Sequence, residues 1–221
     1  MKKKVALFLA CAMMMMFAAC GAIGVATSTI PDKNSLYLTL VNKDHELPDD
    51  WLDQIELVTD FDPWGDEVQI ERETLEHFAD FSAFLLAECG IDIRLDSVYR
   101  SVADQEWLWE EFKNKYGEEY CQQYVAKPGY SEHHTGLAVD ICIAKDGDII
   151  NDNDEMIAME DVFSKIHYYM AEYGFILRYP PNKEDITGYA YEPWHLRYVG
   201  VLPAAEITIR HITLEEYLAE P

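Results

Sequence analysis

The chain has 221 residues, of which 49% are hydrophobic and 13% aromatic, enough for one packed core. No break in composition argues for a second domain. Its 41 acidic and 17 basic residues give a formal net charge of −24. Such a balance repels phosphate backbones and excludes nucleic acid as a partner. We therefore expect one acidic domain, acting as a monomer.

The first 19 residues are typical of an export signal. Three lysines precede an apolar run that is too short to span a bilayer comfortably, and Ala18 and Ala19 supply small residues before a cleavage point. Cys20 follows directly, and "FAAC" resembles the lipobox of bacterial lipoproteins, whose cysteine is lipidated. Phe17 replaces the usual leucine, so the alternatives are cleavage without lipidation and an incidental cysteine in an ordinary signal or an uncleaved anchor.

These features divide the chain into three parts. We expect a signal peptide over residues 1–19, a flexible tether over 20–35, which is small and polar without periodicity, and a folded domain over 36–221. Without the first 19 residues, which carry three lysines and no acid, 14 basic and 41 acidic residues remain, a charge of −27. The predicted location is the outer face of the cell membrane, through a lipid anchor, or the cell wall after secretion.

Within the domain, the first clear elements are a helix and a strand. Apolar residues recur at helical spacing from Leu75 to Cys89, and Gly90 supplies a left-handed end to that helix. The next segment, "IDIRLDSVYR", alternates apolar and charged residues with a period of two, which predicts a strand with one wet face. Helix and strand are thus joined by a tight turn.

A second helix follows that strand. Ser101 and Asp104 have the spacing of a capping box, and "ADQEWLWEEFKNKYG" continues as a helix to Gly117. Arg100 therefore stands where the strand meets the helix. This junction brings a guanidinium to the end of a strand.

The second half of the domain mixes the two periods. The segment "GLAVDICI" alternates as a strand, a helix is expected through "MIAMEDVFSKIHYYMAEYG" to Gly174, and "FILRYP" and "GYAYEPWHLRYVG" read as extended. Regular strand–helix–strand repetition is missing. The sequence therefore predicts an α+β fold with a small antiparallel sheet and helices packed on it.

Asp140 interrupts the apolar strand "GLAVDICI". It shares one face with Ala138 and Cys142, so a partner can approach its carboxylate, and a charge there requires compensation. A metal ion would supply it, because one imidazole of His133 or His134 can fold back toward Asp140 from the preceding loop. The alternative is an aspartate paired with an arginine, beside a histidine satisfied in its loop.

The segment "YEPWHLRYVG" supplies the second half of a candidate site. Glu192 and His195 are three residues apart with a stiffening proline between them, so both side chains can aim at one point. A hydrolytic zinc site needs three N or O ligands, an open position for water and a nearby carboxylate base. His133, Asp140 and His195 fit the ligands and Glu192 the base, and two imidazoles favour zinc (Zn2+) over magnesium.

The sequence resembles a known family at these positions. "SEHHTGLAVD" fits S-x-H-x-x-G-x-A-x-D and "EPWH" fits E-x-W-H, the paired signatures of the VanY-like D-alanyl-D-alanine carboxypeptidases. These are zinc peptidases of bacterial cell-wall metabolism with a hedgehog/D,D-peptidase-like fold. The resemblance also takes in "LVNKDHELPDDW", "YRS", "YGFILRYPPNKEDITGYAYEPWHLRYVG" and "TLEEYL", so it covers nearly everything from Leu36 onward.

The resemblance implies roles residue by residue. His133, Asp140 and His195 would bind zinc, and Glu192 would act as general base and then general acid. Arg100 would lie near the scissile carbonyl or the terminal carboxylate, with Ser131 and Gln105 lining the same end. The implied substrates are peptidoglycan stem peptides, from which the terminal D-Ala is removed.

Two other functions stay open. The same zinc site serves an L,D-carboxypeptidase or a D,D-dipeptidase, because motifs do not encode the loops that select chirality and length. A non-catalytic cell-wall-binding lipoprotein is the third candidate, against which the retention of Glu192 counts, since a binding site has no need of a base.

Several further residues are interpreted as structural. His134 is expected at the rim of the site, and Cys142 is expected to pack in the interior instead of acting as a fourth ligand. The acidic loop "KDGDIINDNDE" lacks the order of a calcium-binding loop and reads as a solvated turn. The aromatic residues of the last extended segment could stack on a substrate, but aromatic residues at alternate strand positions are more often in the core, where we expect them: Tyr189, Tyr191, Trp194 and Tyr198.

Overall fold

The computed structural model describes residues 35–220, apart from the side chain of Gln123. The predicted signal peptide, Cys20 and all of the tether before residue 35 lie outside the described residues. Among residues 35–220, no helix is both long enough and apolar enough to cross a membrane.

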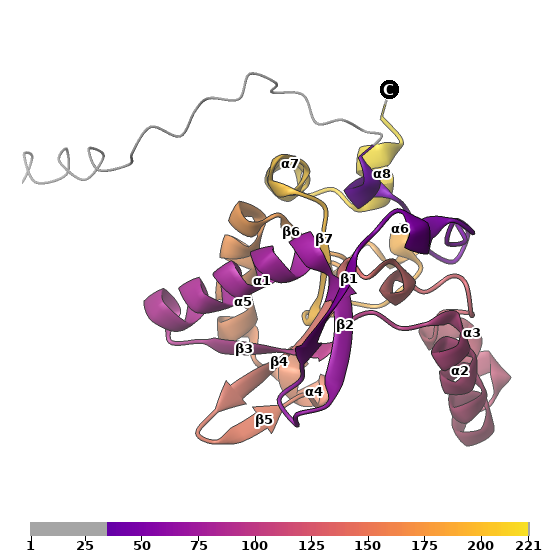
Figure 1. Cartoon of the computed structure of the whole chain (residues 1–221), viewed down its shortest axis with the longest axis horizontal. Helices are drawn as coiled ribbons and strands as arrows, with labels where there is room; N and C mark the ends of the chain where they lie inside the picture. The colour runs from indigo at the N-terminus through magenta and orange to yellow at the C-terminus, as the bar shows by residue number, and fades with distance from the viewer. Residues whose placement is uncertain (1–34, 221) are drawn as a thin grey trace, which may run out of the picture. The chain divides into compact units, whose positions relative to one another are not determined.

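The centre of the domain is a five-stranded antiparallel sheet (Figure 1). Its strands follow the order β3-β4-β7-β6, with β5 beside β4. Their bounds are β3 Asp92–Ser97, β4 Ala138–Lys145, β5 Asp148–Ile150, β6 Phe175–Leu177 and β7 His195–Tyr198. A separate hairpin joins β1 Leu57–Phe61 to β2 Glu67–Glu71. The α+β fold with a small antiparallel sheet is therefore confirmed.

Eight α-helices accompany the two sheets in the part of the chain that the structure describes. Their bounds are α1 Arg72–Phe84, α2 Val102–Tyr116, α3 Glu118–Tyr124, α4 Asn153–Ala158, α5 Glu160–Tyr169, α6 Glu184–Thr187, α7 Val201–Arg210 and α8 Leu214–Leu218. Short 3-10 turns cover Leu36–Leu38, Trp51–Asp53, Glu132–Thr135 and Met170–Tyr173, and a π-helical turn covers Leu85–Cys89.

One face of the sheet carries the main core. Val139, Ile141 and Ile143 alternate along β4 and pack in one cluster with Phe81 of α1 and Phe163 of α5. Because side chains alternate across a strand, the intervening Asp140 points to the opposite face. The core therefore fixes β4 in a register that leaves one carboxylate free to face a site.

The predicted end of the first helix and the predicted start of the second are confirmed. Gly90 takes the left-handed conformation with φ of 67° after the π-helical turn that extends α1. At the start of α2, the Ser101 hydroxyl accepts from the Asp104 amide at 3.1 Å. The Ser101 hydroxyl in turn donates to the Asp104 carboxylate at 2.6 Å, so the two side chains of the cap are bonded to each other.

The helix expected up to Gly174 is broken in the structure, so that prediction was wrong in its length. The chain leaves the helical region at Met159, whose ψ is 45°, and α4 and α5 lie on either side of this turn. Ile157 of α4 lines a pocket, Met156 of α4 borders both that pocket and the core, and Phe163 of α5 is in the core.

The last extended segment is also shorter than expected. Only His195–Tyr198 forms a strand, and the residues from Gly188 to Trp194 run as an irregular loop. Pro193 lacks the amide hydrogen that a strand requires. The loop bends around the candidate site, which places its side chains along a pocket.

Candidate active site

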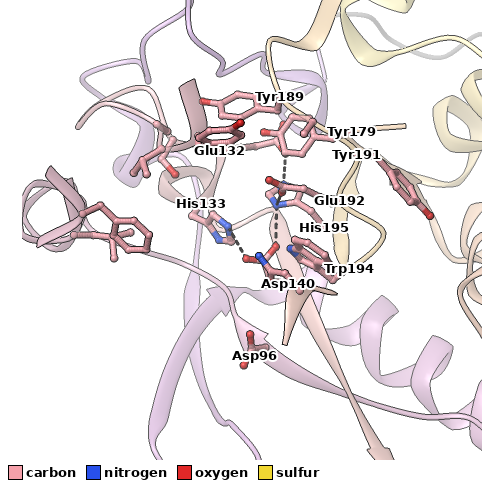
Figure 2. Close-up of a pocket in the computed structure, with 18 of the residues that line it drawn as sticks. Asp96, Glu132, His133, Asp140, Tyr179, Tyr189, Tyr191, Glu192, Trp194 and His195 are labelled. Atoms are coloured by element: carbon pink, nitrogen blue, oxygen red, sulfur yellow. Dashed lines mark hydrogen bonds and ion pairs between the residues drawn. The ribbon is translucent and has the colours of Figure 1, made fainter. Parts of the chain in front are cut away.

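Three segments bring His133, Asp140 and His195 together (Figure 2). The 3-10 turn Glu132–Thr135 carries His133, and β4 and β7 pair so that Asp140 stands directly opposite His195. The Nε2 atom of His133 lies 3.1 Å from Asp140 Oδ2, and Nδ1 of His195 lies 2.8 Å from Asp140 Oδ1. One ligand atom from each residue lies within 4.8 Å of the others.

The second nitrogen of each imidazole fixes its tautomer. His133 Nδ1 lies 2.7 Å from the carbonyl of Val98, and His195 Nε2 lies 3.0 Å from the Glu132 carboxylate. Both partners only accept hydrogen bonds, so these nitrogens carry the hydrogens. When each ring is neutral, the lone pairs of His133 Nε2 and His195 Nδ1 then face Asp140.

A lone pair facing a carboxylate needs a cation between them. Asp140 Oδ1 is buried and has no hydrogen bond, although His195 Nδ1 is only 2.8 Å away. Against the effect of burial, Asp140 and Glu132 raise the pKa of His195 to about 10, so this position attracts positive charge. Two imidazoles and a carboxylate are a donor set that suits a zinc ion. Zinc would take the place of the proton that the raised pKa of His195 otherwise keeps on Nδ1.

Glu132 is a functional residue that sequence reasoning missed. It is fully buried and accepts from three donors: Arg178 Nε at 2.7 Å, Arg197 Nη1 at 2.6 Å and His195 Nε2 at 3.0 Å. Burial alone would raise its pKa, but the two guanidiniums and His195 bring the pKa of Glu132 well below its usual range. Glu132 therefore holds the outer nitrogen of His195, as carboxylates often do behind metal-ligating histidines.

A signal for Glu132 was present in the sequence. Arg178 and Arg197 each interrupt an apolar segment, in "FILRYP" and "WHLRYV". Two buried arginines require a buried anion, and the acid beside the histidine pair is the one that serves.

Glu192 lies beside the cluster without joining it. Its Oε2 atom is 3.8 Å from His195 Nδ1, and its side chain is 27% exposed. Burial, together with the charges of Asp140 and Glu132, raises the pKa of Glu192 to about 7, while His195 opposes the shift. A carboxyl group with such a pKa can take up and return a proton near neutral pH.

Arg100 reaches the same pocket from the junction of β3 and α2. Its Nη1 donates to Gln105 Oε1 at 2.8 Å and its Nη2 to Ser97 Oγ at 2.9 Å. The Gln105 amide donates in turn to the carbonyl of Ala126 at 2.8 Å, so Gln105 orients the guanidinium. Burial lowers the pKa of Arg100, and Asp140 and Asp104 oppose this. Ser131 is also buried beside the pocket.

The pocket has a volume of about 450 Å³ and opens from the histidine–aspartate cluster. All predicted site residues inside the described range line it: Arg100, Gln105, Ser131, His133, Asp140, Glu192 and His195. Tyr189, Tyr191 and Trp194 also line it. Trp194 belongs to the main core as well, as expected, whereas Tyr189 and Tyr191 lie outside the core clusters, so for these two the prediction was wrong. Tyr198 is in the core, as expected.

Two other predictions concern neighbours of the cluster. His134 was expected at the rim, which is wrong: it is 1% exposed, its Nδ1 lies 2.6 Å from the carbonyl of Arg100, and Gly129 donates to its Nε2 at 3.1 Å. It therefore fixes the backbone that carries Arg100. Cys142 is buried, as expected, with its thiol 3.7 Å from the carbonyl of Arg94. The acidic segment 145–155, expected as a solvated turn, is a turn only at Asp146 and Gly147, and the rest of it contributes the end of β4, the strand β5 and the start of α4.

Comparisons with known proteins agree with this geometry. Residues 67–201 match the model of a family described as VanY, D-alanyl-D-alanine carboxypeptidase. A bifunctional D-Ala-D-Ala dipeptidase and carboxypeptidase, VanXYC of Enterococcus gallinarum, is 47% identical over 128 residues, which cover 57% of this chain and 66% of the relative. The chain thus spans just under two thirds of the length of that relative.

Solved structures show the same similarity. A vancomycin-resistance D,D-pentapeptidase, a VanY variant in complex with Zn(II), has a TM-score of 0.68 and 31% identity, covering 83% of this chain and 99% of that one. The LdcB LD-carboxypeptidase has a TM-score of 0.67 and 36% identity, covering 82% of this chain and 85% of that one.

Proposed function

The chain belongs to the VanY family of D-alanyl-D-alanine carboxypeptidases, and we propose that it binds zinc and removes the terminal D-alanine from peptidoglycan stem peptides. The observation that carries the proposal is the convergence of two imidazole lone pairs on Asp140, with Glu192 beside them. A site that only held a metal or a peptide would not need the second carboxylate.

Zinc suits the donor set of His133, Asp140 and His195, and the solved VanY relative was obtained with Zn(II). When bound, zinc lowers the pKa of water and polarises a carbonyl group. The chain holds its ligands ready for this, because the Val98 carbonyl and Glu132 fix the orientation of both imidazoles.

The protein's own residues then move one proton and hold one charge. Glu192 accepts the proton of the attacking water on its carboxylate and returns it to the amine of the departing D-alanine. Its pKa of about 7 suits both transfers, because neither the acid nor the base form is strongly favoured.

Arg100 supplies the positive charge on the other side of the cluster. Gln105 and Ser97 hold its guanidinium, whose planar fork can bind a terminal carboxylate through two hydrogen bonds. A substrate with a free C-terminus fits this arrangement. Ser131, beside it, offers a hydroxyl to the same end of the substrate.

A second candidate is an L,D-carboxypeptidase or a D,D-dipeptidase with the same site. The observation in its favour is that the LdcB LD-carboxypeptidase and the VanY structure resemble this chain almost equally, with TM-scores of 0.67 and 0.68. The experiment that separates the candidates incubates zinc-loaded protein with a pentapeptide, a tetrapeptide and D-Ala-D-Ala. Release of D-alanine from the pentapeptide alone supports the first proposal, and cleavage of only the tetrapeptide or the dipeptide supports the second.

We also propose that the protein works outside the cytosol. A wall-peptide hydrolase is useful where its substrate is, and residues 1–19 have the pattern of an export signal. Lipidation of Cys20 would hold the domain at the membrane, with residues 21–35 as a tether. A non-catalytic lipoprotein is disfavoured because it would have no use for Glu192.

A further inference from the structure

The hydroxyl of Tyr189 is a buried polar group that the chemistry described above does not use. Tyr189 stands in the loop between α6 and β7, is 7% exposed and lines the pocket (Figure 2). Within residues 35–220, only Asp140 Oδ1 and the Tyr189 hydroxyl are buried side-chain polar atoms without a hydrogen-bond partner. Asp140 Oδ1 belongs to the metal cluster, which leaves the tyrosine unexplained.

The surrounding structure prevents this ring from turning its hydroxyl elsewhere. The ring of Tyr179 lies 4.8 Å from that of Tyr189, between centroids, and Lys43 Nζ lies 4.5 Å from the centroid of the Tyr189 ring. The Thr187 hydroxyl donates to the Tyr189 carbonyl at 3.2 Å and ties down its backbone. These contacts hold the Tyr189 ring in place, although an unpaired buried hydroxyl lowers the stability of the fold.

The hydroxyl is available to donate a hydrogen bond to an incoming group that carries lone pairs. Burial, and then the charge of Glu192, raise the pKa of Tyr189 well above its usual value, so the phenol keeps its proton. Tyr189 lines the same pocket as Glu192, His133 and His195, so its hydroxyl lies on the catalytic side. Yet Glu192 does not accept from it. The missing partner is an acceptor that arrives with the substrate.

We infer that Tyr189 is a substrate-binding residue whose hydroxyl donates to a peptide carbonyl oxygen of the bound stem peptide. This inference rests on the proposed function. Arg100 already provides for the terminal carboxylate, and zinc held by the histidine–aspartate cluster would provide for the carbonyl that is attacked. The remaining acceptors on a peptide are the carbonyls on the acyl side of the cleaved bond. A donor that meets one of them contributes to binding and leaves the chemical step unchanged.

The test removes one oxygen atom at a time from two tyrosines. Tyr189→Phe deletes a hydroxyl that has no partner in the free protein, whereas Tyr198→Phe deletes one that donates to Glu73 Oε1 at 2.9 Å. Tyr198 is also buried but lies in the core and not along the pocket. Both zinc-loaded variants are compared with the wild type by thermal unfolding and by steady-state hydrolysis of a pentapeptide.

The two variants should show opposite patterns. Tyr189→Phe is expected to unfold at the same temperature as the wild type or higher, with KM raised about 3- to 10-fold and kcat within twofold. Tyr198→Phe should unfold at a lower temperature with KM unchanged. An unchanged KM in Tyr189→Phe, or a drop in its unfolding temperature like that of Tyr198→Phe, would overturn the inference. Failure of the wild type to cleave any peptide would instead overturn the proposed function.

Discussion

Replacing Glu132 by glutamine tests the electrostatic framework behind the candidate site. Glu132 Oε1 accepts from Arg178 and Arg197, and Oε2 accepts from His195, all in a fully buried position. A carboxamide has nearly the same shape but presents N–H groups where the carboxylate had an acceptor. Two buried guanidiniums then lose the charge that compensates them.

The size of the effect follows from this burial. Removing one partner of a buried ion pair costs about 3–5 kcal/mol, a large share of the roughly 5–15 kcal/mol that keeps a domain folded. Arg178 keeps Glu215, with contacts of 2.6 and 3.0 Å, so the lower half of the range is expected. With a urea m-value of about 2 kcal/mol/M, a loss of 3–4 kcal/mol lowers the unfolding midpoint by about 1.5–2 M.

The same substitution should weaken metal binding. If the carboxamide presents its N–H to His195, the imidazole loses the acceptor that keeps its hydrogen on Nε2, and the lone pair on Nδ1 is no longer secured. We expect a zinc affinity about 10- to 100-fold lower. The assays are urea unfolding at neutral pH and competition for zinc against a chelator.

A matched control separates burial from charge. Glu216 pairs with Lys183 at 2.8 Å nearer the surface, and glutamine can replace it in the cap of α8. Glu216→Gln should cost no more than about 1 kcal/mol and leave zinc affinity unchanged. If Glu132→Gln behaved like this control in both assays, the proposed support of His195 by Glu132 would be refuted.

Three further predictions concern Arg100, Gly174 and Cys20. Arg100→Lys keeps the charge but loses the fork that Gln105 and Ser97 hold, so kcat/KM should fall about 10- to 100-fold at unchanged zinc content; near-normal kinetics would make Arg100 structural. Gly174→Ala places a Cβ 2.6 Å from Tyr198 at φ +82° and should cost about 2–4 kcal/mol in urea unfolding, against about 1–2 kcal/mol for Gly65→Ala, whose Cβ meets nothing within 4 Å; equal losses would contradict the steric argument. Wild-type protein should partition into detergent and Cys20→Ser should be released or remain uncleaved; a soluble wild type with another N-terminus would exclude lipidation at Cys20.

Local patterns predicted the elements whose ends are set by single residues. The period of two marked β3 and β4, and Gly90 and Ser101 marked where helices end and begin, because these signals act within a few residues. The hairpin β1–β2 and helices α7 and α8 were not predicted. The break at Met159 was also missed, because it depends on how α4 and α5 pack in the folded domain, which a local pattern does not show.

The candidate site was predictable as a set of residues but not as a geometry. Motif spacing pointed to His133, Asp140 and His195, yet the pairing of Asp140 opposite His195 depends on a register between strands that are distant in sequence. Glu132 was missed because an acid in a loop is ordinarily solvated. Its compensating partners Arg178 and Arg197 come 46 and 65 residues later, and only the fold brings them together.

The roles of Tyr189 and His134 depended on burial, which the sequence does not show. Aromatic residues near a strand usually fill the core, and Tyr198 does, but the loop before β7 turns Tyr189 toward the pocket. His134 looked like a second site histidine and is instead a buried link between the Arg100 carbonyl and the Gly129 amide.

The central claim is that this chain uses zinc with Glu192 as a base that does not bind the metal. The most direct measurement determines zinc content and pentapeptide hydrolysis by mass on the same sample of Glu192→Gln, beside wild type and His195→Ala. We predict that Glu192→Gln keeps the zinc of the wild type and loses at least about 100-fold in turnover, while His195→Ala loses both. Zinc lost from Glu192→Gln but kept by His195→Ala, or full activity in metal-free wild type, would contradict the account.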